Sequence, residues 1–392
     1  MLERKQIGIQ PSQPHSYLEH QEQQLYEWVI TRDGFEGGHT IAHVVHQPTS
    51  SGAATLFPIP EEFSPHTDNT PQLLRRAHIQ GQQTAMGKDF WHSRKCLLFN
   101  HDCHISTIRG SVSMPGVSAK EVAFANADSD ELYFILEGEG YLYSPLGMNR
   151  FRENDYLLIP RGIPYHFQCT KSIRGLCISG KPTLEIPAEF RNPHGQLKLE
   201  APYAHRHFSS PERLLKDKEA SCFQNVVTLK GGVFSQHSYR HNPYLLRGWD
   251  GSVYPITFNI LNYMPKTGKY HLPPNLHLTF RGNHFVVCSF VPRMVDYGKG
   301  AIPCPYPHTN PSCEEVLYYV SGDFTSRKGI HAESLSYHPM GISHGPQPGK
   351  YQASMERRST DEIAVMIDTW KELKLTRTAQ AHDDPHYETS WQ

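Results

Sequence analysis

Three residues in the last third of the chain have side chains that bind transition metals. His308 precedes an apolar run, Glu315 opens that run, and His344 ends a Pro-x-Gly turn further along. Two imidazoles and one carboxylate form the facial triad that holds Fe(II) in non-haem oxygenases, and the triad leaves coordination positions open for a substrate and O2. The sequence therefore predicts a site for one Fe(II) ion as cofactor.

The carboxylate ligand requires a choice, because Glu314 and Glu315 are adjacent. Side chains alternate between the two faces of a strand, so only one of the two can point toward the metal. Six residues separate Glu315 from Gly322, and six residues also separate Glu131 from Gly138 in a similar earlier segment. This shared spacing favours Glu315 as the ligand.

That earlier segment belongs to the first of two similar copies. The first copy contains Glu131–Gly138 and the turn Pro160–His166, and the second contains Glu315–Gly322 and the turn Pro339–His344. Two such copies predict two small β-barrels of the jelly-roll type.

The first barrel is expected to be degenerate. It has Phe124 and Asn126 where a histidine ligand would be needed, and its His166 lies one residue further from the proline than His344 does.

Short apolar runs separated by turn residues predict a mainly β fold. The chain has 392 residues, and its 30 prolines and 29 glycines disfavour long helices. We expect a continuous buried strand at 363–370 and a weak helical pattern at 211–218. The expected segments are an irregular N-terminal arm with loops (1–95), a degenerate jelly-roll barrel (96–182), a connector (183–240), a catalytic jelly-roll barrel (241–375) and a polar tail (376–392), of which the last dozen residues are expected to be mobile.

Composition excludes several classes of protein. The formal net charge is −1, which argues against a nucleic-acid-binding surface. Mean hydropathy is −0.54, and the absence of a long apolar run argues against a membrane-spanning helix. Residues 1–6 lack the apolar stretch of a signal peptide, so we expect a cytoplasmic protein. The eight cysteines form no CxxC pair and are expected to be reduced and mostly buried.

Several longer motifs carry a resemblance to a known family. They are His308–Phe324, Leu335–Pro346, Arg247–Pro255 and His271–Leu276. Together they resemble the homogentisate 1,2-dioxygenase family, most closely a shorter bacterial branch, and the likeness is clearest over 240–375. The resemblance implies a cupin-like chain with one Fe(II) in its C-terminal part. It also implies extradiol-type cleavage of homogentisate by O2 to maleylacetoacetate, in tyrosine and phenylalanine breakdown, by a homo-oligomer (a trimer or a dimer of trimers).

The resemblance also assigns roles to residues. It places the iron ligands on His308, Glu315 and His344, and the histidine that handles the proton of the ring hydroxyl on His271. His338 matches another histidine of the family's site, although it could instead orient a metal ligand.

Other residues near these motifs have open roles. His277 is a second candidate for the base. Tyr318, Tyr319 and Phe324 could wall the aromatic ring of a substrate, or could be ordinary strand packing.

Two departures from the longer family members keep alternatives open. Phe324 stands where those members carry a substrate-contacting tyrosine, and Thr309 stands where they carry an arginine. A site that lacks hydrogen-bond donors to the carboxylate of a substrate normally binds that carboxylate more weakly. The alternatives are a gentisate- or hydroquinone-type ring-cleaving dioxygenase on the same scaffold, and a metal-binding cupin without redox activity.

Overall fold

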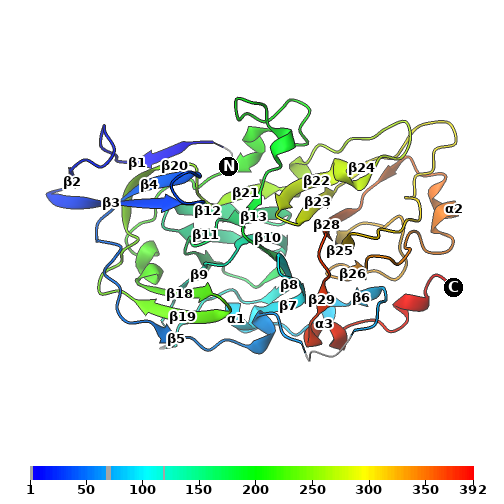
Figure 1. The fold of residues 1–392 in the computed structure, drawn as a ribbon, viewed down its shortest axis with the longest axis horizontal. Coiled ribbons are helices and arrows are strands. Elements are labelled where there is room, and N and C mark those ends of the chain that lie inside the picture. Colours follow the sequence, from blue (N-terminus) through cyan, green and yellow to red (C-terminus); the bar gives the residue numbers. More distant parts are fainter. Residues whose placement is uncertain (1–2, 68–71, 118–119) are drawn as a thin grey trace.

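The protein is mainly β, as predicted from the sequence. The computed structural model describes residues 3–67, 72–117 and 120–392. Parts of the expected N-terminal arm (1–2 and 68–71) and of the expected first barrel (118–119) lie outside the described residues. Two cupin-like barrels lie side by side, with a further sheet from the N-terminal region at the outer end of the first barrel (Figure 1).

The N-terminal barrel is built on an eight-stranded sheet. In spatial order its strands are β17 (Phe208–Ser209), β21 (Ile256–Asn259), β13 (Asp155–Ile159), β10 (Asp130–Glu137), β15 (Ile173–Gly180), β8 (Cys103–Gly110), β7 (Arg94–Phe99) and β29 (Lys374–Leu375).

Two smaller sheets complete this barrel. The first consists of β12 (Gly147–Phe151), β11 (Gly140–Ser144) and β14 (His166–Gln168), and the second of β5 (Thr55–Leu56), β19 (Val233–Ser238), β18 (Asn225–Lys230) and β9 (Ala123–Asn126). The aromatic rings of Tyr133 on β10 and Phe167 on β14 lie 5.2 Å apart, so the large sheet packs on a small one through a shared apolar core.

The C-terminal barrel is built on a seven-stranded sheet. In spatial order its strands are β16 (Leu184–Glu185), β22 (Leu278–Gly282), β23 (Phe285–Phe290), β28 (Ile363–Thr369), β25 (Glu314–Ser321), β26 (Leu335–His338) and β6 (Ala77–Ile79). A separate pair consists of β24 (Arg293–Met294) and β27 (Ser359–Thr360). The α-helices are short: α1 (Phe90–Ser93), α2 (Lys350–Ser354) and α3 (Arg377–Ala381). The expected buried strand at 363–370 is confirmed as β28.

The N-terminal region is more regular than the sequence suggested. It forms a five-stranded sheet of β1 (Lys5–Gly8), β20 (Leu246–Gly251), β4 (His39–Val44), β3 (Gln23–Thr31) and β2 (Leu18–His20). Four of these strands come from the expected arm, and β20 comes from the segment expected to open the catalytic barrel. The arm is therefore a sheet that covers one end of the first barrel.

Strand pairing crosses the segment boundaries expected from the sequence. Strand β21, from the expected catalytic barrel, pairs with β13 of the first barrel. Strand β6, from the expected arm, pairs with β26 of the second barrel, and β29 near the C-terminus pairs with β7. Each pairing covers a sheet edge that would otherwise present unpaired backbone groups. The two barrels are thus interlocked through strands exchanged between the two halves of the chain.

The expected connector, 183–240, is also divided between the barrels. Its β16 joins the second barrel, while β17, β18 and β19 join the first. The helix expected at 211–218 is wrong: a 3-10 helix follows instead, at Glu219–Gln224. The Glu219 carboxylate accepts hydrogen bonds from the Arg213 side chain and the Lys216 backbone, which holds the preceding segment as a turn.

The large sheets of the two barrels pack against each other. The rings of Phe134 on β10 and Tyr318 on β25 lie 6.4 Å apart, and the Tyr156 hydroxyl lies 3.0 Å from the Ser289 hydroxyl. Buried apolar residues of both barrels form one continuous core. Tyr318 faces the first barrel, which fits the alternative of ordinary strand packing, and strand alternation turns Tyr319 to the opposite face.

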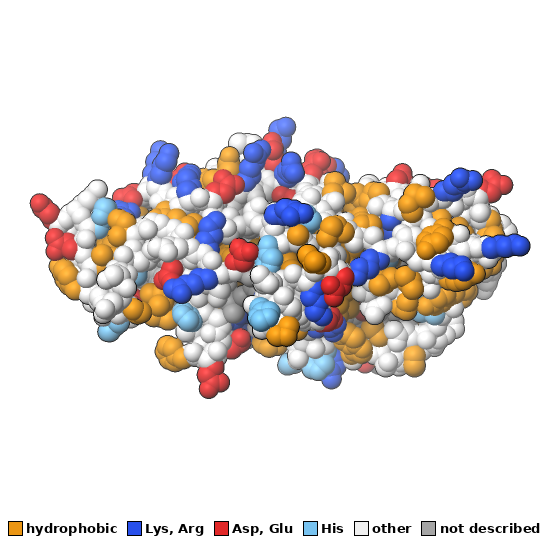
Figure 2. Space-filling view, turned by 90° about the horizontal axis from the view of Figure 1, so that it is seen from above, with side chains coloured by type: hydrophobic (Ala, Val, Ile, Leu, Met, Phe, Trp, Pro, Cys, Tyr) orange, Lys and Arg blue, Asp and Glu red, His pale blue; other side chains and the backbone are white. Residues whose placement is uncertain are grey.

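Other expectations concern the surface and the cysteines. All eight cysteines are free and seven of them are buried, as predicted. No helix in the described part of the chain is long and apolar enough to cross a membrane. Basic and acidic side chains are interspersed on the face shown in Figure 2, and hydrophobic side chains gather over the half that holds the C-terminal barrel.

The interlocked strands predict that the two barrels unfold together. Neither barrel can lose its sheet without exposing the edge of the other, so we expect one cooperative transition in scanning calorimetry. The calorimetric and van't Hoff enthalpies should agree to within about 20%, as in a two-state transition. Two separate transitions would show that the barrels are independent domains.

Candidate metal centre

His308, Glu315 and His344 come together at the floor of a cavity in the C-terminal barrel. Each offers one ligand atom, and these atoms lie within 4.8 Å of one another. The backbones of His308 and His344 exchange two hydrogen bonds of 2.8 and 2.9 Å, and their rings lie 4.2 Å apart. Glu315 is the second residue of β25 and faces the same point. The spacing noted in the sequence thus corresponds to one three-residue cluster.

Both imidazoles present the same nitrogen to the cluster. His308 Nδ1 lies 3.4 Å from the Tyr306 carbonyl, and His344 Nδ1 lies 3.1 Å from the Ile342 carbonyl. A carbonyl can only accept, so each Nδ1 carries the proton and each Nε2 keeps a lone pair. His344 Nε2 is buried without a hydrogen-bond partner among the described residues, and it lies 3.6 Å from Glu315 Oε1. An unpartnered nitrogen beside a carboxylate fits a bound cation.

The electrostatics also suit a metal ligand set. Burial and the neighbouring His344 lower the pKa of His308, which favours the neutral imidazole that a metal requires. Burial alone would raise the pKa of Glu315, but the interactions with His338 and His344 outweigh it and hold this pKa well below its ordinary value. The carboxylate is therefore ionised. Two neutral imidazoles and one carboxylate are the donor set of a non-haem Fe(II) site.

The neighbouring carboxylate of Glu314 points to the other face of β25. It accepts a hydrogen bond from the Leu373 backbone, and burial raises its pKa. Strand alternation thus places Glu315, and not Glu314, beside the two histidines.

His338 lies behind Glu315 and has no exposed surface. Its Nδ1 lies 2.7 Å from Glu315 Oε1. Burial, reinforced by Arg327 and opposed by Glu315, lowers its pKa to about 3, so the ring is neutral. The resemblance allowed His338 a direct part in the site, but its ring is enclosed behind the carboxylate and His338 is not among the residues that line the cavity. Its position fits the alternative role of orienting a metal ligand.

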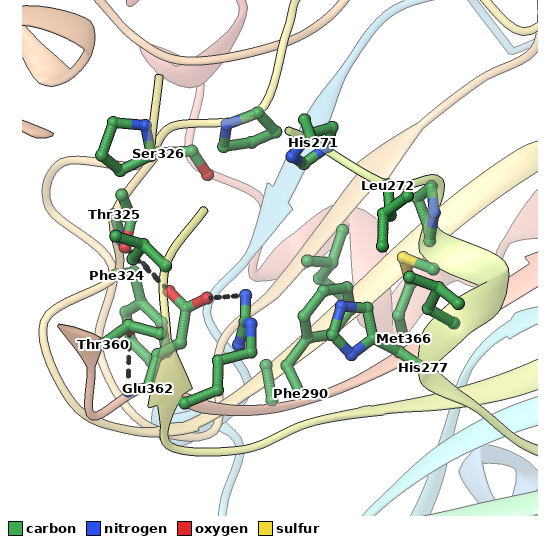
Figure 3. A pocket seen from close by; sticks show the side chains of 18 of the residues that line it. His271, Leu272, His277, Phe290, Phe324, Thr325, Ser326, Thr360, Glu362 and Met366 are labelled. Carbon is green, nitrogen blue, oxygen red and sulfur yellow. Dashed lines mark hydrogen bonds and ion pairs between the residues drawn. The ribbon is translucent and has the colours of Figure 1, made fainter. Parts of the chain in front are cut away.

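The cavity above the cluster is lined by aromatic and apolar side chains together with polar and charged ones. Its volume is about 150 Å³, and an apolar cavity of about 150 Å³ can hold one benzene ring. The rings of Tyr319 and Phe324 meet edge to face, 4.6 Å apart, and both line the cavity. The Tyr319 hydroxyl is already hydrogen-bonded to Ser336 at 2.8 Å, so Tyr319 presents only its aromatic ring to the cavity. Figure 3 shows Phe324 and Glu362 on one side of the cavity and His277 on the opposite side.

The two candidate bases both line the cavity but differ in environment. His271 has a side chain 30% exposed, and its Nδ1 lies 3.5 Å from the Asp296 carboxylate. His277 is buried against Phe290, and its Nδ1 has no hydrogen-bond partner among the described residues. Burial, with smaller contributions from Arg293 and His271, lowers the pKa of His277 to about 3. A group with so low a pKa is a weak proton acceptor, so the geometry favours His271.

Several charged lining residues were missed in the sequence analysis. Arg293 and Glu362 form an ion pair of 3.1 Å, and Glu362 also accepts hydrogen bonds from Thr325 (Figure 3). Arg327 lines the cavity as a buried guanidinium. These residues come from segments far apart in the sequence, so no local pattern could have grouped them.

Comparison with known proteins identifies the family. Residues 56–260, slightly more than half of the chain, match the family model described as homogentisate 1,2-dioxygenase N-terminal. A protein of Saccharolobus solfataricus named "Putative dioxygenase SSO1533" is 32% identical over 387 residues, which cover 98% of this chain and 97% of that protein. The chain belongs to the homogentisate 1,2-dioxygenase family. The homogentisate 1,2-dioxygenase of Emericella nidulans is 22% identical over 301 residues, covering 69% of this chain and 64% of that enzyme, slightly under two thirds.

The solved structures that match the chain are more distant. The oxalate decarboxylase of Lactobacillus farciminis is 13% identical, with a TM-score of 0.34 over 77% of this chain and 88% of that chain. A cupin 2 conserved barrel domain protein of Leptotrichia buccalis is 11% identical, with a TM-score of 0.30 over 77% and 92%. The description of the fold as cupin-like depends on the strand topology. The family assignment makes the chain a dioxygenase that acts on a small substrate with O2, and it indicates a metal cofactor.

In this dioxygenase, the first barrel repeats the backbone pairing found at the metal cluster but lacks the two histidines. Phe124 and Tyr165 exchange two backbone hydrogen bonds of 2.9 Å, as His308 and His344 do. The residue matching His344 is thus Tyr165, and not His166 as the sequence comparison suggested. The corresponding positions are Phe124 and His308, Glu131 and Glu315, Ile159 and His338, and Tyr165 and His344.

The retained carboxylate of the first barrel pairs with an arginine. Arg94 Nη1 lies 2.6 Å from Glu131 Oε1, and both side chains are almost fully buried. Asn126 and Tyr165 also donate hydrogen bonds to Glu131, and Arg94 Nη2 donates to Ser179 at 2.7 Å. Since a buried carboxylate requires a positive partner, the guanidinium supplies the charge that a metal would supply in the other barrel.

This buried pair predicts a large stability effect. Arg94→Met should lower the free energy of unfolding by about 3–5 kcal/mol, because it leaves the Glu131 charge unpaired in the core. Urea denaturation followed by circular dichroism would measure the change. As a control, Arg281→Met breaks the exposed pair with Glu189 and should cost less than about 1 kcal/mol. Equal effects of the two substitutions would contradict this account of the first barrel.

Proposed function

We propose that this family member is an extradiol-type, Fe(II)-dependent ring-cleaving dioxygenase that converts homogentisate and O2 to maleylacetoacetate. The observation that carries the proposal is the convergence of His308, Glu315 and His344 beneath an aromatic-lined cavity. The reaction belongs to tyrosine and phenylalanine breakdown. The homo-oligomer that the resemblance implies, a trimer or a dimer of trimers, stays a prediction.

The side chains of the cavity have distinct tasks in this reaction. His308, Glu315 and His344 would hold the Fe(II), which supplies Lewis acidity and electron transfer when bound. Phe324 and Tyr319 flank the space for the aromatic ring of the substrate, and their apolar surfaces exclude water from it. The aromatic ring of the substrate would lie above the three ligand side chains, where one of its hydroxyl groups can reach them.

His271 is the proposed base for the ring hydroxyl. Its Nδ1 lies beside the Asp296 carboxylate, which favours the tautomer with the proton on Nδ1. Nε2 then keeps the lone pair that takes the proton of the ring hydroxyl. The proton would then be held on His271, near the cavity, until it is returned to the product.

A second substrate class is supported by the composition of the cavity. Phe324 has no hydrogen-bonding group in its side chain, and Arg293 is already paired with Glu362. Neither of these two side chains is therefore free to bind the acetate side chain of homogentisate. Gentisate or another hydroquinone, with the same ring chemistry, is the second candidate.

Activity and metal content together test the proposal. After anaerobic loading with Fe(II), the wild type should bind one iron and consume O2 with homogentisate faster than with gentisate, read from the ultraviolet absorbance of the ring-opened product. Glu315→Gln, His308→Ala and His344→Ala should each lose the iron and at least about 10²-fold in activity, because each removes a ligand. Glu314→Gln, the matched control, should retain both.

Other outcomes would redirect the assignment. Faster turnover of gentisate would favour the second substrate class. Bound zinc, or no metal, together with no O2 uptake would support a metal-binding cupin without redox activity. Iron retained in Glu315→Gln but lost in Glu314→Gln would reverse the choice of carboxylate.

The two cavity histidines provide a test of the base. His271→Gln should lower kcat by about 10²–10⁴-fold, the usual contribution of a positioned base. His277→Gln should lower kcat by less than about tenfold, because burial keeps His277 neutral and weakly basic. Steady-state O2 uptake of iron-loaded variants would measure both, with iron content as the control. The opposite ranking would assign the base to His277.

A further inference from the structure

We propose that Tyr387, in the C-terminal segment (residues 376–392), is a positioning residue of the metal centre, and that it acts on Glu315 through His338. This inference rests on the proposed metal site and assigns a part in it to a segment outside the barrel. From the sequence, these residues were expected to form a polar tail with a mobile end. That expectation is wrong, because α3 and the residues after it pack against the C-terminal barrel and Tyr387 is only 3% exposed.

A continuous chain of hydrogen bonds links Tyr387 to the carboxylate ligand. The Tyr387 hydroxyl lies 3.1 Å from His338 Nε2, and His338 Nδ1 lies 2.7 Å from Glu315 Oε1. Arg327 Nη2 approaches the same Nε2 at 3.4 Å. The His338 ring, which has no exposed surface, therefore joins the C-terminal segment to the metal cluster.

The partners of His338 determine which of its nitrogens carries the proton. A guanidinium can only donate hydrogen bonds, so His338 Nε2, which faces Arg327, must be the acceptor. A neutral imidazole has one donor and one acceptor, so the proton is on Nδ1 and is donated to Glu315. The Tyr387 hydroxyl donates to the same Nε2 lone pair. Together these contacts fix the tautomer and the ring plane of His338, and so hold Glu315 Oε1 in one direction.

The C-terminal segment also reaches the backbone beside the second histidine. Trp391 Nε1 donates to the Gly345 carbonyl at 3.1 Å, and Gly345 directly follows His344. The Trp391 ring lies beneath the Arg76 guanidinium at 4.1 Å, and the Ser390 hydroxyl accepts from Gln347 at 2.7 Å. One short segment thus touches the surroundings of two of the three proposed ligands.

Metal affinity of the protein without added iron tests this role directly. Tyr387→Phe removes the hydroxyl but keeps the buried ring. We expect it to weaken binding of Co(II), used as a spectroscopic probe, by at least about tenfold in chelator competition, the usual effect of losing an outer partner of a ligand. The visible absorption of bound Co(II) should also change. Tyr254→Phe is the matched control, since its hydroxyl bonds the Glu3 carbonyl at 3.0 Å away from the cluster.

The outcomes separate this inference from the proposed function. If the wild type binds no Co(II) or Fe(II), the metal site itself is wrong. If the wild type binds metal and Tyr387→Phe has the same affinity and spectrum, the positioning role is wrong. A loss of affinity with the melting temperature of the metal-free protein equal to that of Tyr254→Phe supports it.

A second variant covers the case in which Tyr387→Phe does not fold. Trp391→Phe removes the indole donor to Gly345 and keeps a smaller aromatic ring, and we expect a smaller loss of Co(II) affinity and a shift of the same absorption bands. Unchanged affinity and spectrum in Trp391→Phe would then overturn the inference.

Discussion

The metal cluster depends on one pair of backbone hydrogen bonds. His308 and His344 come from different loops, and the bonds between their main chains bring them to one place before any side chain is considered. Glu315 reaches the same place because it is the second residue of β25 and the side chains of a strand alternate. The positions of all three side chains therefore follow from strand register, which the extensive pairing of β25 with β28 and β26 stabilises.

The first barrel shows that this frame persists without the histidines. Phe124 and Tyr165 keep the backbone pairing, and Glu131 keeps the buried carboxylate. What differs is the source of positive charge, which is a side chain, Arg94, in one barrel and the proposed metal ion in the other. A buried carboxylate without any such partner would be strongly destabilising. The two barrels therefore neutralise their buried carboxylates by different means.

Local patterns in the sequence predicted the features that depend on local rules. The period of two along a strand showed that only one of Glu314 and Glu315 can face the metal, the spacing to Gly322 selected Glu315, and the apolar run at 363–370 identified β28. Long-range pairing was not predictable in this way. Strands β6, β21 and β29 fill sheet edges far from their own place in the sequence, and only the three-dimensional arrangement shows which edge needs them. The role of Tyr387 was missed for the same reason, because its partner His338 is distant along the chain.

The position of β29 has a consequence for biosynthesis. Lys374 and Leu375 lie near the end of the chain, yet they pair with β7 at the edge of the N-terminal barrel. During translation the N-terminal residues emerge first and domains fold as units when their sequence is available. Here the edge of the first barrel stays open until the strands of the C-terminal barrel have also left the ribosome. The nascent protein therefore has to be protected from pairing with other chains until β29 is available.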